Sequence, residues 1–158
     1  MIRSFLEPVR TFSGPEGRWL LLGKGPSFAR LADCDPGGRR ICTLNHVIER
    51  QPADLAHIAD LDVVEHCGEA ILRNARFLVM PWRPHGADFN ASLVTLETLA
   101  ADHPVLGPLA AEGRLLCYNL STGRGLPPHP EAPWIEADLF SGAVVADLLV
   151  QAGARELR

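Results

Sequence analysis

The stretch that decides the fold reads Arg18-Trp19-Leu20-Leu21-Leu22-Gly23-Lys24-Gly25-Pro26-Ser27. Its apolar half shows no alternation of polar and apolar residues, which is typical of a strand buried on both faces of a parallel sheet. Glycine ends the run, and a helix can begin at Pro26 because proline is tolerated in the first turn. Open α/β sheets bind their ligands beyond the carboxyl ends of the strands. The stretch therefore predicts a strand, a ligand-binding turn and a short helix over residues 26–31.

Further apolar runs predict strands at residues 40–44, 55–59, 77–80 and 114–118. Asp62 is expected to cap a helix that runs through residue 72, with Glu65 at its third position. A second helix is expected from about Asn90, and a third over residues 143–152, where Gly153 stops it. Strands that alternate with helices indicate βαβ units. We therefore expect a Rossmann-like three-layer α/β sandwich with a mainly parallel sheet of five or six strands.

The domain organisation is expected to be simple. Residues 1–17 contain several prolines and glycines, so we expect an irregular lead-in there, followed by a single Rossmann-like nucleotide-binding domain over residues 18–158. The last four residues, 155–158, resemble the beginning of another strand. The chain is therefore interpreted as a C-terminally short relative of a longer fold, or as a fragment.

Composition narrows the classes of partner. The 158 residues carry a formal net charge of −4, which argues against nucleic acid as the main partner but leaves a small anionic ligand possible. We expect a soluble cytoplasmic protein with no membrane span, since there is no signal-peptide core and no apolar stretch of spanning length. The scattered cysteines, none in a Cys-x-x-Cys pair, predict buried free thiols: Cys34, Cys42, Cys67 and Cys117.

The glycine turn is the first candidate site. Gly23 and Gly25 allow the backbone to approach an anion closely, and a following helix would offer free N–H groups. Lys24 can add a point charge and Ser27 a hydroxyl, whereas Pro26 removes one N–H donor. The pattern matches neither the Walker motif nor the dinucleotide motif. A tight strand-to-helix turn without a ligand is the alternative.

Residues at other strand and helix ends are predicted to face the same crevice. Asn45 can bind a base or ribose, or be only a turn residue, and Asp60 can bind a ribose hydroxyl or a metal, or only cap a helix. Ser141 and Gly142 open the last helix, where the alternative is an ordinary N-cap.

The histidines predict no catalytic residue, and the carboxylates are too spread out along the chain to predict a metal cage. His57 is expected to be a core residue. His46 and His85 lie nearer the ligand edge, without an assigned catalytic role. No histidine pair has a recognised zinc spacing.

The order of these motifs resembles the bacterial sialyltransferases and the archaeal-type 6-hydroxymethylpterin diphosphokinases. The resemblance implies that the turn over residues 23–27 and Asn45 contact a donor nucleotide, and that Ser141 and Gly142 lie at its nucleotide end. Asp60 stands where the sialyltransferases have an asparagine. In the sialyltransferases the donor is a cytidine monophosphate sugar, transfer is a direct displacement without an obligatory metal, and a histidine is the general base. That histidine lies beyond a segment that has no counterpart here, so the resemblance assigns no catalytic residue.

Three functions follow as hypotheses. The leading one is a nucleotide-sugar-binding, glycosyltransferase-like transferase that requires no cofactor and uses an acceptor that the sequence does not identify. An alternative is a pterin-type diphosphokinase, in which Asp60 helps to hold Mg²⁺ between triphosphate oxygens. The third is a non-catalytic nucleotide-binding or interaction module.

Overall fold

The computed structural model describes residues 2–26, 28–29, 35–86, 93–121, 125–136 and 140–158. At its centre is an eight-stranded sheet in the order β1-β6-β5-β4-β3-β2-β8, with β7 pairing to β6 outside this path. Every strand pairing is parallel. The strands are β1 (Arg3–Ser4), β2 (Arg18–Leu22), β3 (Arg40–Leu44), β4 (Ala53–His57), β5 (Ala75–Pro81), β6 (Leu115–Leu120), β7 (Trp134–Ile135) and β8 (Glu156–Leu157).

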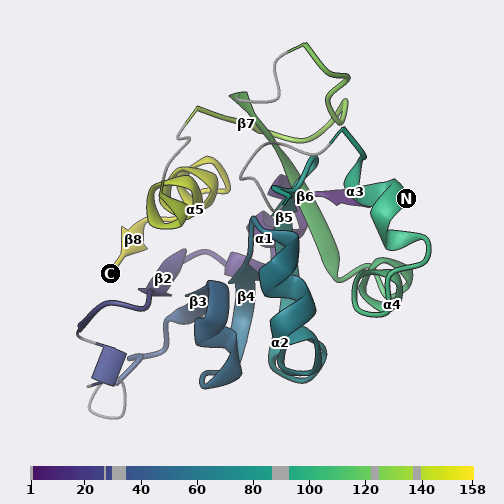
Figure 1. The fold of residues 1–158 in the computed structure, drawn as a ribbon. Coiled ribbons are helices and arrows are strands. Elements are labelled where there is room, and N and C mark those ends of the chain that lie inside the picture. The colour runs from purple at the N-terminus through teal and green to yellow at the C-terminus, as the bar shows by residue number, and fades with distance from the viewer. Residues whose placement is uncertain (1, 27, 30–34, 87–92, 122–124, 137–139) are drawn as a thin grey trace.

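Helices cover both faces of the sheet (Figure 1). On one face, α2 (Leu61–Asn74), α3 (Leu96–Ala100) and α4 (Leu106–Ala111) enclose a core that includes Ile71 and Leu109. On the other face, α1 (Leu6–Ser13) and α5 (Ser141–Gln151) pack over Trp19 and Tyr118. A 3-10 helix, η2 (Asn45–Glu49), follows β3. The predicted Rossmann-like α/β sandwich with a mainly parallel sheet is thus confirmed, but the sheet has eight strands where five or six were expected.

The long central strands match their sequence patterns. β2 and β3 have the predicted bounds, because each is a mainly apolar run that begins at an arginine and is followed by a glycine or a polar residue. β4 begins and ends two residues earlier than predicted, since the apolar run continues past the last paired residue. The strand expected at the end of the chain is present as β8, whose Glu156 pairs with Arg18 and Leu157 with Trp19.

The expected irregular lead-in over residues 1–17 is wrong. β1 pairs with β6, and α1 buries Phe5 and Val9 completely against the sheet. Pro8 was one reason to expect an irregular segment. It lies in the first turn of α1, however, where a backbone N–H has no partner within the helix, so a proline removes no hydrogen bond there. The structured domain therefore includes this segment.

Two predicted helix starts are also wrong. α2 begins at Leu61 with Asp60, not Asp62, at the N-cap position. In the described part of the second predicted helix, α3 begins only at Leu96. Its N-cap is Thr95, whose side chain accepts a hydrogen bond from the Thr98 N–H at 3.3 Å. The spacing of Leu93, Leu96 and Leu99 predicts a shared apolar helix face, but Leu93 is 80% exposed. Asn90 lies outside the described residues.

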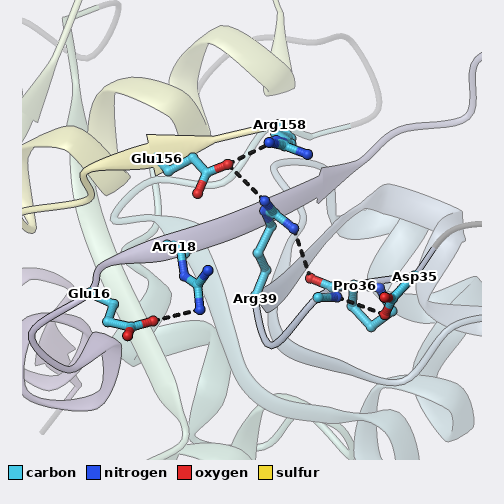
Figure 2. A network of polar contacts seen from close by, with 8 residues as sticks. Glu16, Arg18, Asp35, Pro36, Arg39, Glu156 and Arg158 are labelled. Atoms are coloured by element: carbon cyan, nitrogen blue, oxygen red, sulfur yellow. Dashed lines mark hydrogen bonds and ion pairs between the residues drawn. The ribbon is translucent and has the colours of Figure 1, made fainter.

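The C-terminal strand is held by a charged network (Figure 2). Glu156 Oε1 lies 2.8 Å from Arg39 Nη2 and 2.8 Å from Arg158 Nε, and Arg39 also donates to the Pro36 carbonyl at 3.2 Å. The Arg39 hydrogen bond holds the pKa of Glu156 below its usual range. The network thereby ties β8 to the start of β3 across β2.

No helix in the described ranges is long and apolar enough to cross a membrane.

Candidate functional site at the carboxyl edge

Three of the predicted segments meet at one side chain, that of Leu44 at the end of β3. A Cβ atom placed on Gly23, after β2, would lie 3.6 Å from Leu44 Cδ1. One placed on Gly142, in the first turn of α5, would lie 3.8 Å from the same atom. The glycine turn, the end of β3 and the start of α5 therefore lie close together at the carboxyl edge of the sheet.

The fold does not explain why residues 23 and 142 are glycines. Neither has the positive φ that favours glycine, and at both positions an added Cβ would meet Leu44 at an ordinary van der Waals distance. An alanine would fit at either position without displacing any described atom. A backbone left bare without a packing reason is typical of a place where a ligand approaches closely.

Asn45 joins β3 to η2 and is the only described non-glycine residue with a positive φ, at 51°. This left-handed conformation is several-fold enriched for asparagine, which confirms its role as a turn residue. The turn does not account for its side chain, however. Asn45 Oδ1 is buried and has no hydrogen-bond partner among the residues that the structure describes. An unpaired buried acceptor costs about 1–3 kcal/mol, so this oxygen lacks, in the described part of the chain, the partner that a buried acceptor normally has.

A cavity of about 350 Å³ separates the glycine turn from η2. The Arg50 guanidinium lies 6.0 Å from the centre of the Phe28 ring beside it. The cavity combines an aromatic wall with cationic side chains, and its lining comprises Lys24, Gly25, Pro26, Phe28, Ala29, His46, Val47, Glu49 and Arg50. Such a lining suits an anionic ligand that also carries a flat ring.

The helix predicted after the turn differs from expectation. The Phe28 N–H donates to the Gly25 carbonyl at 2.9 Å, and the described residues of this segment, Pro26, Phe28 and Ala29, form a 3-10 turn. So short a turn contributes little helix dipole to the site. Ser27 lies outside the described residues, as does much of the predicted helix.

The start of α5 supplies the longer helix terminus. Ser141 is the first helical residue, and the N-cap is Phe140, so the alternative that Ser141 is an ordinary N-cap is wrong. A phenylalanine side chain has no acceptor for the first N–H groups of the helix. The first backbone bond of α5 runs from the Val144 N–H to the Phe140 carbonyl at 3.0 Å. The N–H groups that precede it belong to the first turn of α5, whose Gly142 lies beside Leu44.

Below the edge lies a buried polar pair. His57 Nε2 and Tyr118 Oη are 2.9 Å apart, and both side chains are fully buried. Burial lowers the pKa of His57 to about 3, with a smaller contribution from the charge of His85. Burial also raises the pKa of Tyr118, as does the charge of Asp60. His57 is thus the neutral core residue that the sequence predicted.

Asp60 and His85 come together beyond the ends of β4 and β5. His85 Nδ1 lies 3.3 Å from Asp60 Oδ1, with side-chain exposures of 18% and 27%. The alternative that Asp60 only caps α2 fails in the described structure, because the carboxylate occupies the N-cap position without accepting a cap hydrogen bond. Sequence reasoning placed both residues near the ligand edge but did not pair them.

Clustered metal ligands and reactive thiols are absent from the part of the chain that the structure describes. These residues contain no group of three or more His, Cys, Asp or Glu side chains that could hold a metal ion. Cys42, Cys67 and Cys117 are free and buried, as predicted, and burial raises the pKa of each thiol. They are therefore poor nucleophiles at neutral pH. Cys34 lies outside the described residues.

No protein-family model, curated protein or solved structure matches this chain.

Proposed function

We propose that the carboxyl edge of the sheet binds a nucleotide or nucleotide-sugar donor, and that the protein is a glycosyltransferase-like transferase. The observation that carries this proposal is the unpartnered buried oxygen of Asn45, which begins η2 beside the cavity of about 350 Å³. A ribose hydroxyl or the amino group of a base can donate to such an oxygen.

The phosphate would lie between the glycine turn and α5. Gly23 and Gly142 leave bare backbone on two sides of Leu44, and the first N–H groups of α5 have no capping side chain from Phe140. Backbone N–H groups at a helix N-terminus favour negative charge, and the exposed Lys24 adds a cation nearby. Stabilisation of a departing phosphate by the same groups would assist transfer of the attached sugar.

The proposal is tested by calorimetric titration with mono-, di- and triphosphates of cytidine, uridine, guanosine and adenosine, with and without Mg²⁺. We expect selective binding of one nucleotide, and the resemblance to sialyltransferases favours metal-independent binding of cytidine monophosphate. Metal-dependent binding of a triphosphate would instead support the diphosphokinase. A folded protein that binds none of the panel would overturn the proposal.

The matched variant is Asn45→Gly. Glycine adopts a φ of 51° without strain, so this change removes the amide and keeps the turn, whereas alanine would alter both. We expect the variant to be folded and to bind roughly tenfold more weakly or worse, which corresponds to about 1.4 kcal/mol. Unchanged affinity would exclude Asn45 from the site.

A further inference from the structure

A hollow of about 920 Å³ lies at the amino edge of the sheet, opposite the proposed nucleotide site. Its lining comes from the starts of β1, β6, β5 and β4, which are neighbours in the sheet. Adjacent strands are about 4.8 Å apart, so the hollow extends over roughly 14 Å. The charged residues in the lining of this amino-edge hollow are Arg3, Asp54, Arg73, Arg76, Glu112 and Arg114.

The two carboxylates of the amino-edge hollow are already paired. Asp54 Oδ2 accepts a hydrogen bond from the Ile41 N–H at 2.8 Å, and Asp54 Oδ1 lies 3.5 Å from Arg40 Nη1. Glu112 Oε2 lies 2.7 Å from Arg114 Nη1. The charges of both carboxylates are therefore balanced by Arg40 and Arg114.

The other arginines of the lining, Arg3, Arg73 and Arg76, are exposed. None of them forms an ion pair with any residue that the structure describes. A protein with a formal net charge of −4 therefore concentrates positive charge at this edge. Such a local field attracts an anionic partner even when the net charge of the molecule is negative.

Two of these arginines are held in place by neighbouring side chains. The Arg76 guanidinium lies 4.2 Å from the centre of the Phe12 ring and 5.7 Å from that of Phe77. Arg73 Nε donates to Asn74 Oδ1 at 3.2 Å, which leaves both of its Nη groups without an acceptor in the described ranges. Part of the ordering cost of binding is therefore met before a partner arrives.

Arg114 fixes the turn that carries Arg73 and Arg76. Its Nη2 atom donates to the Leu72 carbonyl at 3.0 Å and to the Ala75 carbonyl at 2.6 Å, and its Nε atom donates to the Arg76 carbonyl at 3.2 Å. These carbonyls lie at the end of α2, where the negative end of the helix dipole repels an anion. Arg114 therefore orders the turn and also offsets that repulsion.

We propose that the amino-edge hollow binds an extended acidic segment of a partner protein. The unpaired arginines start from β1, from β5 and from the end of α2, and β1 and β5 are two strand spacings, or about 10 Å, apart. Carboxylates spaced along an extended chain match this separation better than a single phosphate does. Each of them can also form the paired N–H···O bonds that arginine makes with carboxylates.

The inference goes beyond the nucleotide site and does not depend on it, because the two sites use opposite edges of the sheet. A long polyanion such as nucleic acid fits the hollow less well. Beyond the hollow it would meet a surface whose overall charge is negative.

The test is fluorescence anisotropy of the full chain with a labelled peptide of about six alternating aspartate and glutamate residues, long enough to span the hollow. The corresponding peptide of asparagine and glutamine is the neutral control. We expect only the acidic peptide to bind, with an affinity that falls as salt is raised, because salt screens exposed charges. In Arg73→Gln/Arg76→Gln we expect roughly tenfold weaker binding.

Arg155→Gln is the matched control. It removes the same charge from an exposed arginine outside the lining, so we expect unchanged affinity. Thermal unfolding of each variant separates binding from folding, because Arg76 also packs on Phe12. Arg73→Gln alone should weaken binding roughly threefold with an unchanged melting temperature.

Glu112→Gln should have the opposite effect, which a loss of structure cannot imitate. The change removes a negative charge from the lining and releases Arg114 Nη1, so we expect roughly twofold tighter binding. Asn45→Gly should bind the peptide normally, so failure of the nucleotide site and failure of this inference are distinguishable. The inference would be overturned by equal affinities of Arg73→Gln/Arg76→Gln and the unsubstituted protein, by no binding of the acidic peptide, or by tighter binding of inorganic phosphate or a single-stranded oligonucleotide.

Discussion

At the scale of single residues, a substitution at Gly142 distinguishes a role in ligand binding from a role in packing. In Gly142→Ala the new methyl group would meet only Leu44 Cδ1 among described atoms, at 3.8 Å, so we expect an unchanged or slightly higher melting temperature. The methyl group would also occupy the space where a phosphate approaches, so affinity for the nucleotide should fall roughly tenfold, or about 1.4 kcal/mol. Calorimetry and thermal unfolding measure the two effects separately.

Gly68→Ala is the opposite control. Its Cβ would lie 2.7 Å from Val105 Cγ2, inside the core between α2 and the segment before α4, so we expect lower stability with normal affinity. If Gly142→Ala lowered stability and left affinity unchanged, Gly142 would be a packing residue.

The burial of His57 makes the stability of the protein depend on pH. Its pKa falls to about 3 in the folded state, while the unfolded chain binds a proton below about 6.5. Between these values the unfolded state holds more protons, so the free energy of unfolding decreases as the pH falls, by up to about 1.4 kcal/mol per pH unit. His57→Gln should show a shallower decrease between about pH 6 and pH 4.5 in urea unfolding. Equal slopes for both proteins would show that His57 is charged or exposed.

At the scale of elements, the position of β8 depends more on its charged side chains than on the length of its strand pairing. It has only two paired residues, and Glu156 joins it to Arg39. Because the pKa of Glu156 is lowered in the folded state, its contribution is present above the unfolded pKa and is lost as the pH falls through the folded one. Glu156→Gln should speed hydrogen exchange of the Leu21 amide, which donates to the Arg158 carbonyl at 2.7 Å.

Glu16→Gln is the control for this element. It removes the 2.6 Å ion pair with Arg18 on the same side of the molecule without touching β8 (Figure 2). We expect normal exchange of the Leu21 amide in this variant. Equal acceleration in both variants would mean that a general loss of charge, and not the Glu156 network, loosens the strand.

The elements also show what the sequence could predict. β2 and β3 are mainly apolar runs with clear ends, and a residue pattern is enough to bound them. β1 and β7 have two residues each, which is too short for any periodicity. They form because partner strands are already in place, so their presence depends on tertiary structure.

The residues of the candidate site differ in the same way in how far the sequence indicates them. Gly23, Asn45 and Gly142 follow from the rule that ligands lie beyond the carboxyl ends of parallel strands. The Asp60–His85 pair required the strand order, because only the adjacency of β4 and β5 brings the two residues together. The unpartnered oxygen of Asn45 is a property of three-dimensional burial and has no signal in the sequence.

At the scale of the whole molecule, the proposed ligand lies at one edge of the sheet. The opposite, amino edge has a rival surface, a hollow of about 920 Å³ whose lining includes Arg3, Arg73 and Arg76. Several arginines could attract the same anion, so the two edges must be distinguished by direct observation.

The most direct test is NMR mapping of the ¹⁵N-labelled protein with the nucleotide that binds best in the calorimetric panel. We predict that amide shifts concentrate at Gly23, Asn45 and Gly142, and that they disappear in Asn45→Gly at the same nucleotide concentration. Shifts concentrated at Arg73 and Arg76, or no shifts at all, would contradict a nucleotide site at the carboxyl edge.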